Sequence, residues 1–168
     1  MINYHQSRDY FHCCFRISCI LTESKVSKIE FDKLRILDFY TVFPRLAETI
    51  KLPQTMRHAR KAFQAAPAPY QRMSEPTRIY ESMFNIQSMA VHAMIGAGIL
   101  LAEPFSSSGF AQISQDGVAI ANSLVEKFSE RKSPWFRAIV EQLIMIELRG
   151  PDGLKARTGL AEYRYDLT

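Results

Sequence analysis

The longest helix-periodic segment of the chain, Thr77–Leu101, runs through glycine directly into an apolar exit. Gly96 and Gly98 mark the end of the predicted helix, because glycine readily takes the left-handed conformation that closes many helices. The residues that follow, Ile99-Leu100-Leu101, are typical of a strand that enters a core. A break is predicted near residues 85–88, where two helices can meet. The apolar positions supply one core-facing stripe: Ile79, Met83, Ile86, Met89, Ala90, Ala93 and Met94.

A β-hairpin is predicted after this exit. Residues 100–105 would form one arm, Ser106-Ser107-Ser108-Gly109 the turn, and residues 110–114 the other arm. Gly109 can supply the positive φ that a tight turn needs. In a winged helix such a hairpin is the wing, and the helix before it is the recognition helix.

Two further helices are predicted upstream, with a short extended piece between them. The first spans Tyr4–Thr22, where the apolar arc is wide and Arg16 can lie at its margin. The extended piece falls at residues 26–31. The second helix spans Asp32–Phe43 and stops at Pro44, since proline pushes the preceding residue out of the α region. Helix, strand, helix, helix, hairpin is the order of a winged-helix-like core, in a chain that is mainly α.

A proline-rich insertion over residues 44–76 interrupts this core, which is predicted to span residues 1–114. Short helices fit at Arg45–Lys51 and Gln54–Ala65, and the run Ala65–Pro69 is typical of a linker or a surface arm. The prolines of the insertion are Pro44, Pro53, Pro67, Pro69 and Pro76.

A C-terminal helical extension is predicted over residues 115–149. Its helices span Gln115–Arg131 and Trp135–Leu148, and Ser133 caps the second with a proline at the first helical position. Residues 150–168 are predicted to be a tail that stays loose unless a partner holds it.

The charge of the chain is only a weak indicator of nucleic-acid binding. The formal net charge is +4 and the isoelectric point is about 9.0. No apolar run is long enough to span a bilayer. Charged residues interrupt the apolar stretch of residues 1–23, which a secretory signal would not tolerate. The sequence therefore predicts a cytoplasmic protein without membrane contact.

Catalytic and metal-binding signatures are weak. Cys13, Cys14 and Cys19 lie near His12, but neighbouring residues on a helix point about 100° apart, and no second ligand pair has zinc-finger spacing. Small buried hydrophobic residues are the favoured interpretation of these cysteines. Gly96-Ala97-Gly98 lacks the third glycine and the lysine of a phosphate loop. The sequence predicts no enzyme, no metal and no cofactor.

The basic residues lie away from the predicted recognition helix. Asn85–Ala97 contains no lysine or arginine, and the predicted turn of the wing is uncharged. Because phosphate neutralisation dominates DNA affinity, this pair of elements suits protein contact better than DNA reading. The sharpest basic cluster is instead Arg57, His58, Arg60 and Lys61 in the insertion. Contact of Arg57, Arg60 and Lys61 with a DNA backbone and a solvated charge run both remain open.

Two aromatic clusters are candidates for a partner interface. For Phe39, Tyr40 and Phe43, core packing is the first use predicted and an interface anchor is the second. The helix that carries Trp135, Phe136 and Leu143 is expected to bury one side in the core and to offer the other to a partner. On the surface of the second helix, Arg35 and Asp38 are expected to form an i, i+3 pair, either solvated or facing a partner. The interface candidates are Phe39, Tyr40, Phe43, Trp135, Phe136 and Leu143.

The segment Lys33–Pro44, with the sequence KLRILDFYTVFP, resembles middle components of ABC-three-component systems. A first helix such as Tyr10–Leu21 and the exit Gly98-Ile99-Leu100 are similar to that family as well. The resemblance implies a neighbouring ABC or SMC-like ATPase and an effector subunit, as in Lamassu anti-phage and anti-plasmid systems. The chain would then be a small accessory subunit at the ATPase heads or the adjoining coiled coil, with DNA contact a further role inside the complex.

A stand-alone winged-helix transcription regulator is the alternative function. It requires sequence-dependent DNA binding by the isolated chain. An enzyme ranks third.

Overall fold

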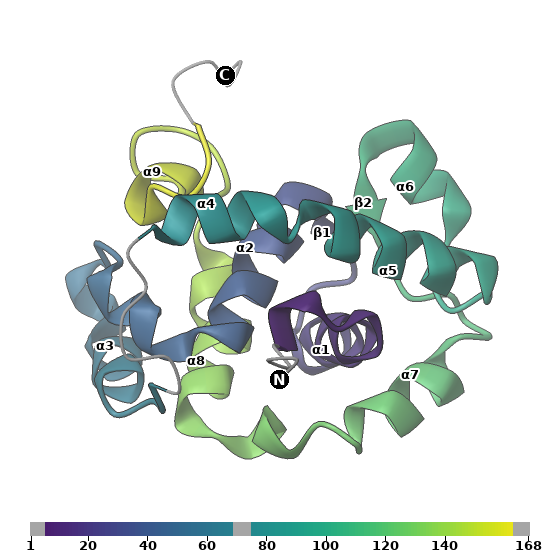
Figure 1. The fold of residues 1–168 in the computed structure, drawn as a ribbon, viewed down its shortest axis with the longest axis horizontal. Helices are drawn as coiled ribbons and strands as arrows, with labels where there is room; N and C mark the ends of the chain where they lie inside the picture. The colour runs from purple at the N-terminus through teal and green to yellow at the C-terminus, as the bar shows by residue number, and fades with distance from the viewer. Residues whose placement is uncertain (1–5, 69–74, 163–168) are drawn as a thin grey trace, which may run out of the picture.

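Helices make up most of the molecule, together with one small antiparallel sheet (Figure 1). The computed structural model describes residues 6–68 and 75–162. The predicted mainly α class is confirmed, and the element order is consistent with a winged-helix-like core. With η for 3₁₀ helices, the described elements are η1 (Gln6–Arg8), α1 (Tyr10–Glu23), β1 (Ile29–Glu30), α2 (Phe31–Val42), η2 (Pro44–Thr49), η3 (Gln54–Met56), α3 (Arg57–Gln64), α4 (Pro76–Ser82), α5 (Phe84–Gly96), α6 (Ala102–Ser108), β2 (Phe110–Ala111), α7 (Val118–Val125), η4 (Ser129–Lys132), α8 (Pro134–Glu141), η5 (Leu143–Met145) and α9 (Leu154–Thr158).

Helix α1 lies at the centre of the fold. Figure 1 looks along its axis, and α2, α5 and α7 pack around it. Residues 16–21 are all buried, so this part of the helix is enclosed on every side, as its wide apolar arc predicts, whereas Phe11 in the first turn is exposed. The helix begins later than the predicted Tyr4, which lies outside the described residues. Asp9 caps it by accepting a hydrogen bond from the His12 N–H at 2.9 Å.

The sheet joins two segments that are distant in sequence. Ile29 of β1 lies opposite Ala111 of β2, and Glu30 lies opposite Phe110. The extended piece predicted at residues 26–31 is thus confirmed as a strand at Ile29–Glu30, whereas Phe31 begins α2. Helix α2 follows β1 at once and ends before Pro44, as the proline rule requires.

The predicted hairpin is only partly present, because helix α6 occupies residues 102–108. The predictions of a strand at residues 100–105 and of a turn at residues 106–109 are therefore wrong. Of the predicted pairing, an isolated antiparallel β-bridge between Leu100 and Ile113 is present. The hydroxyls of Ser106, Ser107 and Ser108 donate to the carbonyls of Glu103 and Pro104 about one turn earlier, so these side chains find acceptors within α6. Gly109 has the predicted positive φ, at +71°, but it closes a helix.

The long periodic segment consists of two helices, as predicted. Helices α4 and α5 meet at Met83, slightly before the predicted break at residues 85–88. Gly98 has a φ of +74°, and the N–H of Ile99 donates to the carbonyl of Met94 at 2.8 Å. The helix therefore ends in a glycine turn that delivers the chain to the sheet.

The proline-rich insertion packs as part of the core. Helix α3 lies against α8 and η2, with Ala59 and Phe63 fully buried. The predicted short helices are present, although residues 44–49 form a 3₁₀ helix. Pro69, the last residue of the predicted linker, lies outside the described residues.

The C-terminal helices are shorter than predicted. Helix α7 covers only Val118–Val125 of the expected helix, and α8 gives way to η5 after Glu141. Ser133 occupies the N-cap position with Pro134 next, as predicted, but its hydroxyl donates to the carbonyl of Glu130 and makes no capping hydrogen bond to α8. A loose tail is wrong for residues 154–160, because Leu154 and Leu160 are buried. One hydrophobic cluster contains residues from 1–114, 115–149 and 150–168, and the division into those three parts stays a prediction.

A buried polar network joins four helices in the core. The Arg16 guanidinium of α1 donates to the Asp38 carboxylate of α2, with distances of 2.6 Å from Nε and 3.2 Å from Nη2. Gln87 of α5 donates to the same carboxylate at 2.9 Å and accepts from Arg35 Nε at 3.0 Å. Arg35 also donates to the carbonyl of Tyr80 in α4. Because these charges are satisfied only in one arrangement, the network fixes how the helices pack.

Two predictions about these charged residues are wrong. Arg16 was expected at a helix margin but is 2% exposed, and the expected surface pair of Arg35 and Asp38 is buried at 9% and 0%. The reason lies in the tertiary packing, which surrounds α2 so completely that residues 34–42 are all buried. Asp38 therefore pairs across helices with Arg16, and not along its own helix.

Substituting Asp38→Asn should lower the free energy of unfolding by about 3–5 kcal/mol, because the Arg16 charge would remain buried without a counter-charge. Urea unfolding followed by circular dichroism measures the change. Asp116→Asn is the matched control, since Asp116 is exposed. Equal stability of the two variants would contradict the importance given to this pair.

Candidate functional site

An uncharged surface lies on the predicted recognition helix and on the last three residues of α6, whose first turn carries the exposed Glu103. We define this uncharged face by Phe84, Asn85, Met89 and His92 of α5 and by Ser106–Ser108 of α6, all of them exposed. Met89 is 56% exposed and Phe84 is 46% exposed. The chain has no lysine or arginine between Arg78 and Lys127. This face therefore offers apolar and neutral polar groups, and no cation for a phosphate.

Ring contacts hold α6 against α5 and α2. The centre of the Phe105 ring in α6 lies 5.4 Å from the centre of the His92 ring and 5.4 Å from that of Phe31. Both pairs are edge to face. Phe31 also contacts Phe84, and the Arg35 guanidinium lies 4.9 Å from the centre of the Phe84 ring. These contacts give α6 a fixed place beside α5, so the uncharged face is a built surface.

A basic face lies on α3. Arg57, His58, Arg60 and Lys61 are exposed, whereas Phe63 on the other side of the helix is fully buried. Arg60 donates to the carbonyl of Leu52 at 3.4 Å. No acidic residue occurs in the sequence between Glu48 and Glu75. The basic face, defined by Arg57, His58, Arg60 and Lys61, can therefore contact an anionic partner such as a phosphate backbone.

The structure does not bring the two faces together. Figure 1 places α3 at one end of the long axis and α5 with α6 toward the other end. A single groove-binding surface that combined the recognition helix with the basic cluster is therefore absent from the described residues. Any contact with nucleic acid through α3 is separate from a contact through α5.

The interface candidates are core residues. Each is at most 6% exposed, so core packing, the first use predicted for Phe39, Tyr40 and Phe43, is what the structure shows for all six. Their side chains present no surface to a partner in this arrangement, because α3 and η2 cover α8 and the end of α2. These residues are Phe39, Tyr40, Phe43, Trp135, Phe136 and Leu143.

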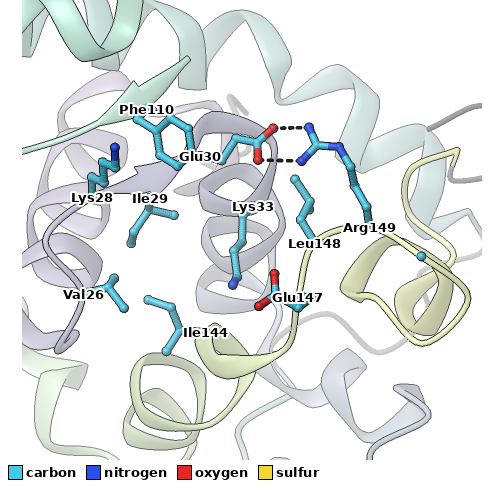
Figure 2. Close-up of a pocket in the computed structure, with 11 residues that line it drawn as sticks. Val26, Lys28, Ile29, Glu30, Lys33, Phe110, Ile144, Glu147, Leu148 and Arg149 are labelled. Atoms are coloured by element: carbon cyan, nitrogen blue, oxygen red, sulfur yellow. Dashed lines mark hydrogen bonds and ion pairs between the residues drawn. The ribbon is translucent and has the colours of Figure 1, made fainter. Parts of the chain in front are cut away.

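A cleft of about 510 Å³ opens between β1, α2 and the segment 144–150 (Figure 2). Sequence reasoning missed it, because the two walls are more than a hundred residues apart in the chain. Its apolar lining consists of Val26, Ile29, Phe110, Ile144 and Leu148, and its charged lining of Lys28, Glu30, Lys33, Glu147 and Arg149.

The cysteines are packed side chains. Cys13 and Cys19 are fully buried, and the Cys13 thiol lies 3.9 Å from Asp38 Oδ2. Burial raises the pKa of Cys13 and Cys14 and raises that of Cys19 to about 12. Thiols held in the neutral form are poor nucleophiles and poor ligands. Within residues 6–68 and 75–162, no group of three or more His, Cys, Asp or Glu side chains could hold a metal ion.

Comparison with protein families identifies the class. A family model for ABC-three-component systems matches residues 2–166, so the chain is a middle component of such a system, with an accessory role in it. Within that class it belongs to the family described as ABC-three component (ABC-3C) system Middle Component 5. Searches of curated proteins and of solved structures each gave no match. None of the described helices is long and apolar enough to cross a membrane.

The raised thiol pKa values predict that the protein loses stability at alkaline pH. Above the ordinary thiol pKa of about 8.5, the unfolded chain releases protons that the folded chain keeps. The unfolded state then binds fewer protons, so the unfolding free energy should fall, by roughly 1–2 kcal/mol for Cys19 by about pH 10. Urea unfolding at several pH values in this range measures how steeply the unfolding free energy falls with pH. Cys19→Ala should make this pH dependence shallower, and an unchanged dependence would contradict the raised pKa of Cys19.

Proposed function

We propose that this chain is a non-catalytic accessory subunit that docks its uncharged face onto an SMC-like ABC ATPase. The observation that carries the proposal is the absence of lysine and arginine from α5 and α6, together with the exposed side chains of Phe84 and Met89. A surface of this chemistry suits contact with protein, where apolar burial supplies the affinity. Membership of the middle-component family supports a partner encoded in the same system.

The complex would serve bacterial defence against phages or plasmids in the cytoplasm, in the manner of Lamassu systems. In this role the subunit binds at the ATPase heads or the adjoining coiled coil, and an effector subunit completes the assembly. The chain itself performs no chemistry, and its buried thiols support that assignment.

A second contact, with the DNA backbone, is proposed for Arg57, Arg60 and Lys61 within the assembled complex. Their exposure on one helix and the lack of nearby acidic residues in the sequence support it. The alternative, a stand-alone transcription regulator, has less support, because its recognition helix would approach DNA without a single cation.

Introducing a charge into the uncharged face should break the complex. With Met89→Glu, co-purification of the neighbouring ATPase with the tagged subunit should fall about tenfold or more, because a carboxylate would be buried without a partner. Met145→Glu is the matched control, since Met145 is 66% exposed and lies on η5. Retention of the ATPase by Met89→Glu at the level of the control would exclude this face.

Removing the three basic side chains should weaken DNA binding by the complex without regard to sequence. The triple variant Arg57→Ala, Arg60→Ala and Lys61→Ala should reduce the steepness of the salt dependence by up to about 3 in a double-logarithmic plot. Gel shifts at several salt concentrations measure it. A control that removes equal charge elsewhere is Lys25→Ala, Lys127→Ala and Lys132→Ala. Tight, sequence-dependent binding by the isolated subunit would favour the transcription regulator instead.

A further inference from the structure

The cleft of Figure 2 runs along the outer edge of strand β1. In the described residues β1 pairs with β2 alone, and the cleft lies on its other side, opposite Ile144 and Leu148. The N–H of Phe31 donates to the carbonyl of Gly109 at 2.8 Å, toward β2. Because backbone groups along an antiparallel strand alternate in direction, those of Lys28, the residue before β1, point away from β2, which is the side on which the cleft lies. An extended chain could therefore hydrogen-bond to this edge.

The cleft also contains a lysine that lacks a close counter-charge. Lys33 extends from α2 into the cleft and points toward Glu147 (Figure 2). No carboxylate of the described residues makes an ion pair with Lys33, although Glu147 and Glu30 act on it at longer range. Burial of the ammonium lowers the pKa of Lys33. A partly desolvated cation of this kind is stabilised when an anion approaches it.

The remaining charges leave the cleft with an excess of positive charge. Glu30 and Arg149 neutralise each other through two hydrogen bonds, one of them 2.8 Å long from Arg149 Nη1. They close one end of the cleft, as Figure 2 shows. The ammonium of Lys28 lies 4.7 Å from the centre of the Phe110 ring. Apart from the Glu30–Arg149 pair, the charged lining therefore consists of two lysines, Lys28 and Lys33, and one carboxylate, Glu147.

We propose that the cleft binds an extended, acidic segment of a partner protein, which adds a strand to the free edge of β1. Side chains of an extended chain alternate between two faces. An apolar side chain of the segment would enter the pocket formed by Val26, Ile29 and Ile144, and a neighbouring carboxylate would pair with Lys33. Addition of a strand to an exposed sheet edge is a common mode of peptide recognition. The proposal does not depend on which protein binds the uncharged face.

The test uses the full-length, ¹⁵N-labelled protein and a synthetic peptide, acetyl-Val-Glu-Val-Glu-Val-amide. NMR titration should give saturable shifts at residues 26–33 and 144–150. The matched peptide with glutamine in place of glutamate should bind about tenfold more weakly or worse, because the charge on Lys33 would stay unpaired. A peptide with methylated backbone amides should also lose affinity, because it cannot donate to the strand edge.

Variants of the protein complete the test. Lys33→Met should reduce the affinity for the acidic peptide about as much as the glutamine peptide does. Lys127→Met is the control, since Lys127 is exposed on the α7–η4 connection, and it should bind as the wild type does. Equal binding of the acidic and glutamine peptides, equal binding of the methylated peptide, or shifts confined to other residues would overturn the proposal. The peptide comparisons decide the outcome even if Lys33→Met fails to fold.

Discussion

The buried ion pair between Arg16 and Asp38 is the interaction on which the rest of the structure depends. Burying two charges costs free energy, and only a complete set of partners offsets that cost. Here the partners come from different helices. Arg16 of α1 and Gln87 of α5 both donate hydrogen bonds to the Asp38 carboxylate, and Gln87 accepts one from Arg35. A helix that lost its register would leave a charge unsatisfied. The network thus selects one arrangement of α1, α2 and α5.

The same network decides what the protein presents to a partner. Gln87 faces the core, and a helix turns about 100° per residue, so Asn85, Met89 and His92 must face outward. These three residues of the uncharged face therefore lie on the far side of the helix that completes the buried network. The basic face arises in a similar way on α3, where the burial of Phe63 orients Arg57 and its basic neighbours toward solvent. On both helices, one side packs in the core and the opposite side presents exposed residues to a partner.

Several features that depend on local backbone effects were predicted correctly, whereas several that depend on contacts between distant segments were not. Helix α2 ends where Pro44 requires, and Gly98 closes α5 as expected, because both are local backbone effects. Residues 102–108 were predicted as part of a hairpin and form α6, in which serine hydroxyls bond to carbonyls one turn earlier. Short segments of this kind fit either a turn or a helix, and ring contacts with Phe31 and His92 favour the helix.

The sequence by itself determined the mainly helical class, the C-terminal ends of α2 and α5, the basic cluster on α3 and the lack of lysine and arginine on α5. These features depend on single residues and their neighbours in the chain. Only the tertiary structure decided that Arg16 and Asp38 are buried, that Trp135 packs inside, and that the segment 144–150 forms a cleft with β1. The physical reason is that burial and pairing depend on which distant segments meet. That choice is made by the free energy of the whole core and leaves no periodic mark in the sequence.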